Sequence, residues 1–273
     1  NPKTFKLDYA FDRVKTLLLA VLDDDTLLSD SSLERSRLAL QRVDVYTGLP
    51  YYLPSKNIWS SLVAHFVNNN SIMTYLPLLN FMKPLSLNGM FYAVKKETLG
   101  RVGGFKAILH QLGDDYAMAK LIKSKGGVIV QGVEPQAVQT SVMDAKHYLK
   151  LMQRWFLFAQ LQILGQPLAV KLLLFIFLGL PSLLLLVSIA SLIASWLGLL
   201  ILLLALALRY FTVRRLQNKL FPDLQHFSFF ISILSECLQP FHMLHAALVK
   251  RIRWRSRSIR LQKNGTFSYL EDT

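Results

Sequence analysis

A stretch of 37 residues without a charged side chain, residues 172–208, constrains this chain more than any other feature. It reads LLLFIFLGLPSLLLLVSIASLIASWLGLLILLLALAL. One transmembrane helix needs about 20 predominantly apolar residues, so the stretch is long enough for about two crossings. The whole chain is 18% charged, against about 25% in a typical soluble domain. A purely soluble enzyme is therefore excluded.

We predict two membrane helices, at about 170–188 and 190–208, joined by a turn near Ser188–Ser191. A third segment, 227–249, is also long enough to cross, but it holds polar and helix-disturbing residues. These are Glu236, Pro240, His242 and His245. Such residues are costly in lipid, so we favour an interfacial or re-entrant segment and leave a third crossing as the alternative.

Basic residues gather in two clusters beside the apolar segments, at 209–219 and 250–263. The formal net charge of the chain is +14. Lys and Arg beside membrane spans are typical of a cytoplasmic face that meets anionic lipid headgroups. Nucleic acid is not expected as a partner, because no aromatic-interleaved soluble module accompanies the clusters. The single cysteine, Cys237, excludes an intramolecular disulfide and fits a reducing compartment.

The first 155 residues have the pattern of an α/β domain. Short apolar runs at Thr16–Leu22, Gly89–Val94 and Val128–Val133 predict strands. A helix is expected from Asp114, with Gly126 as its C-terminal stop. Strands and helices that alternate at this spacing predict an open α/β sheet. We therefore expect an α/β domain at 1–155 on the cytoplasmic side and a membrane region at 156–273, which ends in a basic tail at 250–273.

Residues 145–162 form the clearest amphipathic helix of the sequence. Lys146, Lys150 and Arg154 are spaced by four residues and share one stripe. The opposite stripe is apolar: Leu149, Met152, Phe156 and Ala159. This pattern predicts a helix that lies in the membrane interface, directly before the predicted spans.

Two acidic clusters are candidates for chemistry. Asp23-Asp24-Asp25 follows a predicted strand, where ligands bind in open α/β sheets, and carboxylates there can hold Mg²⁺ or Mn²⁺ against a diphosphate. The alternative is an acidic turn that caps a helix. Asp114-Asp115 opens a helix and could supply a general base or simply an N-terminal cap.

A third candidate is Gln153-Arg154-Trp155, at the end of the amphipathic helix. Arg can form bidentate hydrogen bonds with phosphate oxygens, and Trp can stack on a sugar or a lipid. Ordinary interfacial anchoring by Trp and Arg is the alternative.

The order of these clusters resembles family 2 inverting glycosyltransferases with a GT-A fold, whose pattern runs D, DxD, (E/T)D, (Q/R)xxRW. Within that group the sequence is most similar to ceramide glucosyltransferase and the hopanoid glycosyltransferases. Short stretches that carry the likeness are Asn1-Pro2-Lys3, Leu22–Asp25, Asn88-Gly89-Met90, Val102–Phe105, Asp114-Asp115-Tyr116 and Ile252–Ile259. The likeness covers nearly the whole chain.

The resemblance implies a role for each matching residue. Asp115 would be the catalytic base, and Asp23 and Asp25 would hold a divalent cation, Mg²⁺ or Mn²⁺. Lys3 would approach the nucleotide, and Asp114 would take part in donor or acceptor binding. The diphosphate and the acceptor entrance would be lined by Gln153, Arg154 and Trp155.

The sequence departs from the family pattern at three places. The first aspartate of the pattern is absent and the chain starts at Asn1, so we expect an upstream part to be missing. Asp114 replaces the usual Glu before the catalytic Asp. Leu151 stands where the (Q/R)xxRW pattern has Gln or Arg.

The function implied is transfer of glucose or a related hexose from a nucleotide-sugar, expected to be a UDP-sugar, to the hydroxyl of a membrane lipid. The lipid would be ceramide-like, a diacylglycerol or a hopanoid, and the transfer would be inverting and metal-assisted. The resemblance implies an integral membrane protein with a cytoplasmic catalytic face. Two alternatives stay open: a processive polysaccharide synthase of the same superfamily, and a non-catalytic membrane scaffold with a degenerate glycosyltransferase domain.

Overall fold

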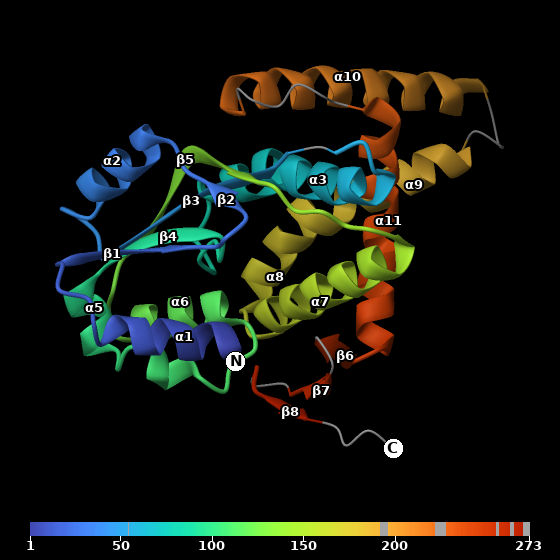
Figure 1. The fold of residues 1–273 in the computed structure, drawn as a ribbon. Coiled ribbons are helices and arrows are strands. Elements are labelled where there is room, and N and C mark those ends of the chain that lie inside the picture. Colours follow the sequence, from blue (N-terminus) through green and yellow to red (C-terminus); the bar gives the residue numbers. More distant parts are fainter. Residues whose placement is uncertain (54, 192–195, 222–227, 255–256, 263–264, 270–273) are drawn as a thin grey trace. The chain divides into compact units, whose positions relative to one another are not determined.

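The computed structural model describes residues 1–273 except 54, 192–195, 222–227, 255–256, 263–264 and 270–273 (Figure 1). The chain divides into two compact units. Unit 1 comprises Asn1–Pro50, Met82–Gln139 and Lys250–Thr273, and unit 2 comprises Tyr51–Phe81 and Thr140–Val249. This grouping differs from the expected division after residue 155 in two ways. Residues 51–81 group with the C-terminal helices, and the tail from residue 250 groups with the N-terminal sheet.

Unit 1 is built on a five-stranded sheet with the order β1-β4-β3-β5-β2. The strands are β1 (Leu18–Leu22), β2 (Thr26–Leu27), β3 (Val45–Tyr52), β4 (Phe91–Lys95) and β5 (Ile129–Val138). β4 pairs antiparallel with both β1 and β3, and β2 pairs antiparallel with β5. The three predicted strands are therefore confirmed, as is the α/β fold class.

Helices cover the sheet of unit 1 (Figure 1). They are α1 (Pro2–Phe11), α2 (Asp30–Ala39), α5 (Lys96–Arg101), the 3-10 helix η2 (Phe105–Ile108) and α6 (Asp114–Ser124). The side chains of β4 alternate between two cores because neighbouring residues of a strand point to opposite faces. Tyr92 and Val94 pack in the larger core with α5, η2 and α6. Phe91 and Ala93 pack in a smaller core with the end of α2.

α6 begins at Asp114 and ends before Gly126, as predicted. Met118 and Ile122 are fully buried in the larger core, which explains the apolar stripe of this helix. Gly126 has a φ of 76°, a left-handed conformation that glycine adopts without strain, so the helix stops there.

The basic tail forms a second, three-stranded sheet in unit 1. Its strands are β6 (Arg251–Trp254), β7 (Arg257–Leu261) and β8 (Phe267–Tyr269). The amide of Leu112 donates to the carbonyl of Gly265 at 3.1 Å, and Gln111 forms a β-bridge with Thr266. These backbone bonds place the tail beside the segment that leads into α6.

Unit 2 is helical. Its elements are α3 (Ile58–Asn70), the π-helix η1 (Ser71–Tyr75), α4 (Leu76–Leu78), α7 (Ala145–Leu164), α8 (Leu168–Leu174), the π-helix η3 (Phe175–Gly179), α9 (Leu180–Ala190), α10 (Trp196–Leu220) and α11 (Phe229–Leu248). α11 packs on both α3 and α7. α7 confirms the predicted amphipathic helix, with Tyr148, Met152 and Phe156 buried.

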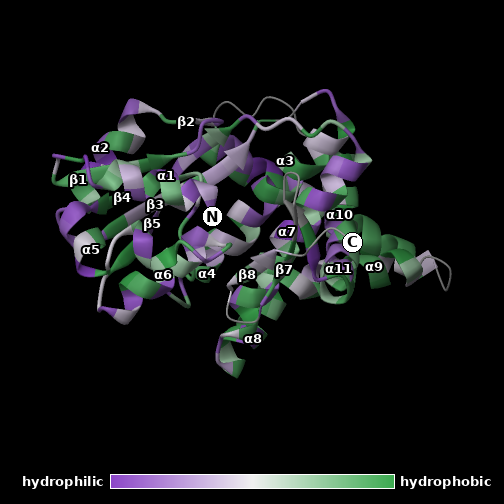
Figure 2. Ribbon diagram, turned by 60° about the horizontal axis from the view of Figure 1, so that its bottom comes forward, coloured by the Kyte–Doolittle hydropathy of each residue, from purple (hydrophilic) through white to green (hydrophobic). Residues whose placement is uncertain are grey.

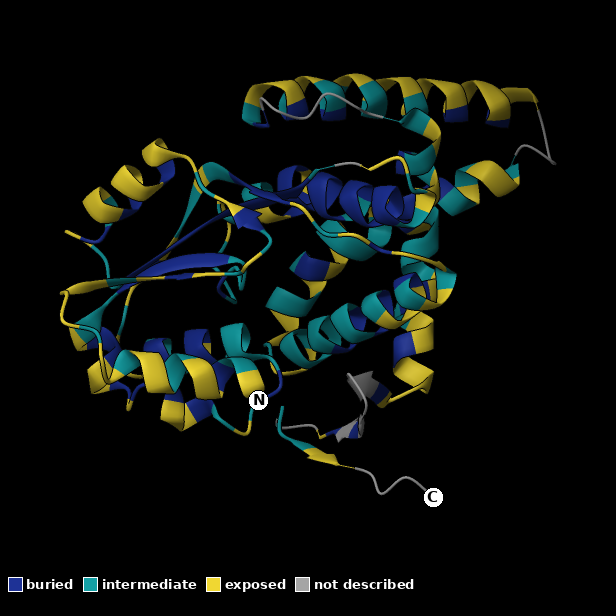
Figure 3. Ribbon diagram, in the orientation of Figure 1, coloured by how far each residue is buried: buried dark blue, intermediate teal, exposed yellow. Residues whose placement is uncertain are grey.

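Among the described residues of unit 2, two helical segments are long and apolar enough to cross a membrane: Leu168–Ala190 and Trp196–Leu220. Only 17% of the most apolar window of each is buried. Figure 2 shows hydrophobic residues along α8 and α9, and Figure 3 shows α10 exposed over most of its length. Exposed apolar helices of this length suit a lipid environment.

The second apolar helix differs from the expectation of 190–208. It begins at Trp196 and runs to Leu220, so the basic cluster 209–219 continues the same helix instead of following it. Arg, Lys, Gln and Leu are all good helix formers, and no Pro or Gly interrupts residues 199–220. The first apolar helix extends over Leu168–Ala190, so the region of the expected turn, Ser188–Ser191, is still helical up to Ala190, and Ser191 is the C-cap. Residues 192–195, which follow, lie outside the described residues.

The segment 227–249 is helical as α11 from Phe229 to Leu248, and residue 227 lies outside the described residues. Glu236 of this helix is paired with Arg209 of α10, so its charge is compensated within unit 2. The interfacial or re-entrant position of α11 stays a prediction.

Candidate functional site

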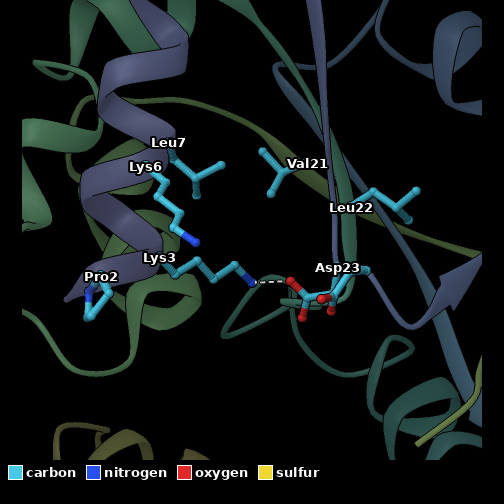
Figure 4. Close-up of a pocket in the computed structure, with 8 residues that line it drawn as sticks. Pro2, Lys3, Lys6, Leu7, Val21, Leu22 and Asp23 are labelled. Atoms are coloured by element: carbon cyan, nitrogen blue, oxygen red, sulfur yellow. Dashed lines mark hydrogen bonds and ion pairs between the residues drawn. The ribbon is translucent and has the colours of Figure 1, made fainter.

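An open pocket of about 310 Å³ lies between the start of α1 and the end of β1 in unit 1. It is lined by Pro2, Lys3, Lys6, Leu7, Val21, Leu22, Asp23 and Asp24. Figure 4 shows Lys3 and Lys6 extending from α1 toward β1, with Asp23 on the opposite side. The pocket therefore brings cations and carboxylates together where a strand of the sheet ends, a place where open α/β sheets bind ligands.

Lys3 is the central cation of the pocket. Its Nζ donates to Oδ1 of Asp23 at 2.6 Å and to the carbonyl of Gly89 at 2.9 Å (Figure 4). Burial alone would lower the pKa of Lys3, but the carboxylates of Asp114, Asp23 and Asp115 outweigh it and raise the pKa. Lys3 is therefore firmly protonated and offers a positive charge to an anionic ligand.

Asn1 anchors the start of α1. Its side-chain oxygen accepts from the amides of Lys3 and Thr4, which is an N-cap. Its Nδ2 donates to the carbonyl of Gln111 at 3.2 Å and approaches Asp114 Oδ1 at 3.5 Å. The segment Asn1-Pro2-Lys3 is thus fastened to the segment that precedes the candidate base.

Asp115 has the electrostatics expected of a general base. It is half-buried in the first turn of α6, where its Oδ1 accepts from the amide of Tyr116 at 2.8 Å. Desolvation, and next the charge of Asp114, raise the pKa of Asp115 from 3.8 to about 6, although Lys3 opposes this. A carboxylate of this kind is ionised at neutral pH and still basic enough to accept a proton.

The Asn88-Gly89-Met90 turn connects the two acidic clusters. A Cβ on Gly89 would lie 3.1 Å from Oδ2 of Asp115, so only glycine leaves the carboxylate its present place. The amide of Asp23 donates to the carbonyl of Met90 at 2.9 Å. This turn therefore contacts Asp115 on one side and the Lys3–Asp23 pair on the other.

A buried polar network supports this turn. The amide of Asn88 donates to Oγ1 of Thr47 at 2.8 Å, and its Nδ2 donates to Oε1 of Gln136 at 3.0 Å. Gln136 is fully buried against Gly48, where a Cβ would collide with the glutamine amide. Buried hydrogen bonds of this kind hold a backbone turn in one conformation.

Sequence reasoning missed Tyr92. This residue of β4 is buried, and burial, reinforced by the charges of Asp114, Asp115 and Asp23, raises its pKa far above the usual range. Tyr92 therefore stays protonated near the three carboxylates. No sequence signal marks Tyr92, because it lies in an apolar strand and only the fold shows which carboxylates act on it.

The donor set present does not by itself fit a bound metal ion. Asp23 is the ion-pair partner of Lys3, and its neighbour Asp25 accepts through its backbone carbonyl from the amide of Gln139 at 2.8 Å. Within the described part of the chain, no group of three or more His, Cys, Asp or Glu side chains could hold a metal ion together. The metal role of Asp23 and Asp25 stays a prediction.

Gln153, Arg154 and Trp155 lie on α7 in unit 2. Gln153 Nε2 donates to the carbonyl of Val249 at 2.9 Å, and burial lowers the pKa of Arg154. Trp155 contacts the rings of Tyr52 and Phe66, with centroids 6.0 and 6.1 Å away. These contacts pack α7 within its unit, and the role of the three residues at the donor or acceptor stays a prediction.

Among known protein families, the sequence model of glycosyl transferase family 21 matches residues 1–267 of this chain. The match covers nearly the whole chain. This chain belongs to glycosyltransferase family 21. The resemblance that the ordered acidic and Gln-Arg-Trp motifs indicated is therefore confirmed, and the protein is a glycosyltransferase with an α/β domain and two apolar helices of spanning length.

Membership of the family gives the polar site of unit 1 its context. A glycosyltransferase binds a nucleotide-sugar donor and an acceptor. In this glycosyltransferase, Lys3, Asp23, Asp114 and Asp115 are brought together from three distant stretches of sequence. The acidic turn and the helix start, 90 residues apart in sequence, belong to one site.

Proposed function

We propose that this glycosyltransferase moves a hexose from a nucleotide-sugar to the hydroxyl of a membrane lipid, with Asp115 as the catalytic base. The observation that carries the proposal is the carboxylate of Asp115. It has a pKa raised to about 6 and contacts the Gly89 turn to which Lys3 is also bonded. A base, a cation and a pocket in one compact unit are the parts that sugar transfer requires.

Each residue of the site receives a role in a single displacement. Asp115 takes the proton of the acceptor hydroxyl while that oxygen attacks the anomeric carbon. The bond from this carbon to the nucleoside diphosphate breaks, and the leaving group departs with the electron pair, so the configuration inverts. Lys3 offsets negative charge on the departing diphosphate, as a preorganised cation does in a transition state.

A divalent cation, Mg²⁺ or Mn²⁺, belongs to the proposal as well. When bound, such an ion neutralises charge on a leaving diphosphate. Asp23 and Asp25 are its proposed ligands, together with phosphate oxygens of the donor. The preference for a UDP-sugar and for glucose or a related hexose rests on the family resemblance alone.

The lipid acceptor is supported by the two apolar helices of unit 2 and by the family. Helices of this length and exposure suit integration into a bilayer, and the basic residues 209–219 suit a cytoplasmic end. Sugar nucleotides are cytosolic, so a cytoplasmic catalytic face would meet its donor there. The amphipathic pattern of α7 suits a helix at headgroup depth.

The test is transfer from a radiolabelled nucleotide-sugar to lipid in membranes that contain the full-length protein. Asp115→Asn removes the base and keeps nearly the same shape, so we expect lipid labelling to fall by at least about 10², the lower range for general-base catalysis. Asp30→Asn, at an exposed position of α2, is the matched control and should keep full activity. Wild-type turnover by Asp115→Asn would refute the assignment, and a polymeric product would favour a processive synthase.

A further inference from the structure

Unit 2 contains a charged pair that the transfer reaction does not use. Arg209 of α10 and Glu236 of α11 are hydrogen-bonded to each other, with only 17% and 11% of their side chains exposed. Arg209 also donates to Ser232 at 3.2 Å, and Asn69 donates to the same hydroxyl at 2.9 Å. Buried charges are costly unless paired, so such a pair inside an apolar helix group needs a reason.

A cavity of about 450 Å³ adjoins this pair. Its wall is mostly aliphatic and aromatic, from η3, α9 and α10, and includes Ile176, Phe177, Leu184, Leu185, Leu202 and Leu206. Polar groups of Asn69, Asn70, Arg209, Glu236 and Gln239 also line it. The volume lies within the usual range for small-molecule sites, about 300–1,000 Å³.

We propose that this cavity is a binding site for an uncharged membrane lipid with an aliphatic tail and a hydroxyl- or amide-bearing head. The tail lies along the apolar wall, and the head bonds with the amides and with the Arg209–Glu236 pair. This inference goes beyond the proposed function, because it assigns a lipid site whether or not the bound lipid receives the sugar.

The location argues for a lipid rather than a soluble ligand. α9 and α10 supply much of the wall, and both belong to the segments long and apolar enough to cross a membrane. α9 packs on α10 and on α11, so the cavity is framed by neighbouring helices of one unit (Figure 1). A ligand that reaches such a place partitions into the bilayer first.

The charge balance argues for an uncharged head. One cation and one anion line the cavity and are bonded to each other, so the pair is neutral. A phosphate head would have to compete with Glu236 for Arg209 and would leave the carboxylate buried without its partner, which is strongly unfavourable. Hydroxyl and amide groups can instead bond to both partners without separating them.

Occupancy is tested by photolabelling of the purified full-length protein. The probe is a long-chain N-acyl amino alcohol with a diazirine in its tail. Leu206→Trp fills the cavity, and we expect labelling of α9 and α10 peptides to fall about tenfold, equivalent to about 1.4 kcal/mol of binding free energy. Leu204→Trp is the matched control, because Leu204 is 70% exposed on the same helix and does not line the cavity. Equal labelling of the two variants overturns the proposal.

Head selectivity is tested with a second probe that carries the same tail and a phosphate head. Glu236→Gln leaves Arg209 as an uncompensated cation, so the ratio of phosphate-probe to neutral-probe labelling should rise about tenfold. The double variant Arg209→Gln/Glu236→Gln is neutral again and should return the ratio to the wild-type value, which also controls for poor folding of the single variant. An unchanged ratio in Glu236→Gln, or a raised ratio in the double variant, overturns the assignment.

The two proposals of this protein fail separately. Asp115 lies in unit 1 and is not part of the cavity, so Asp115→Asn should lose transfer and keep wild-type photolabelling. Loss of labelling in a transfer-competent Leu206→Trp variant would show a lipid site that the reaction does not need. If Asp115→Asn keeps both transfer activity and wild-type labelling, the assignment of Asp115 as the base fails and the lipid site stands.

Discussion

The ammonium of Lys3 lies 2.6 Å from Oδ1 of Asp23 and 2.9 Å from the carbonyl oxygen of Gly89. One cation thus joins the start of α1, the end of β1 and the turn that contacts Asp115. Because Lys3 contacts all three places, we expect its removal to affect both donor binding and the pKa of Asp115.

We expect Lys3→Met to weaken nucleotide-sugar binding and to shift the pH profile. Lys3 lowers the pKa of Asp115, so its loss should raise that pKa and move the acid limb of kcat/KM toward higher pH. The measurement is lipid glycosylation across pH with the full-length protein. Lys6 lines the same pocket, so Lys6→Met is the control and should leave the acid limb of kcat/KM in place. An acid limb that does not move in Lys3→Met would contradict the electrostatic role of Lys3.

The activity of the wild-type enzyme should rise with pH through about 6 and then level off. Asp115 has its pKa raised to about 6 by desolvation and by Asp114, and only the ionised carboxylate can accept a proton. Asp114→Asn removes the raising charge, so the limb should move to lower pH. An acid limb of the pH profile that moves to higher pH in this variant, or does not move, would argue against Asp115 as the titrating base.

Asp115→Asn should unfold at a higher temperature than wild type at neutral pH. Because the folded pKa of Asp115 lies above its unfolded value of 3.8, its contribution to stability is full below that value and is lost as pH rises through about 6. At neutral pH the ionised group therefore costs on the order of 2–3 kcal/mol at 1.36 kcal/mol per pKa unit. Thermal unfolding at about pH 4 and about pH 7 should show the gap between the proteins widening with pH.

Gly89→Ala should lower kcat without unfolding the protein. The added Cβ would lie 3.1 Å from Oδ2 of Asp115, closer than most real contacts, so the carboxylate must shift. A displacement of about 1 Å at a catalytic group costs roughly 10² in rate. Gly100→Ala is the control, since a Cβ there meets nothing within 4 Å; equal activity of both variants would show that the Gly89 contact is unimportant.

Metal binding should depend on the donor. The described residues do not complete a metal site, so we expect Mn²⁺ to bind weakly to the protein alone and more tightly when UDP supplies phosphate oxygens. Calorimetric titration with Mn²⁺, with and without UDP, measures the difference. Asp25→Ala should reduce it, and tight Mn²⁺ binding without nucleotide would contradict the expectation.

Local sequence patterns determined much of unit 1. The apolar runs at 16–22, 89–94 and 128–133 contain β1, most of β4 and the first half of β5, and α6 begins at Asp114 and stops before Gly126 as the pattern predicts. The order of the acidic motifs also pointed to the family that the chain matches. These signals are local or ordered along the chain, so the sequence carries them directly.

The end of α10 and the pairing of the basic tail do not follow from the sequence pattern. The pattern ends the second apolar helix at the first charged residues after position 208, but the helix continues through the basic residues to Leu220 because these residues are good helix formers. The strands of the tail pair with one another, and the tail also bonds to residues 111–112, which lie more than 140 residues before their partners in sequence. No local pattern encodes such long-range pairing.

By itself the sequence determined the apolar spans, the strands and the candidate acids, because each depends on residue type and spacing within a short window. The tertiary structure decided which of these residues meet. It brought Lys3 to Asp23, placed Gly89 against Asp115, exposed the buried Tyr92 to the charges of three carboxylates and paired Arg209 with Glu236. Coulombic interactions weaken with distance and strengthen with burial, so pKa shifts and charge pairing depend on distances and on a degree of burial that only folding sets.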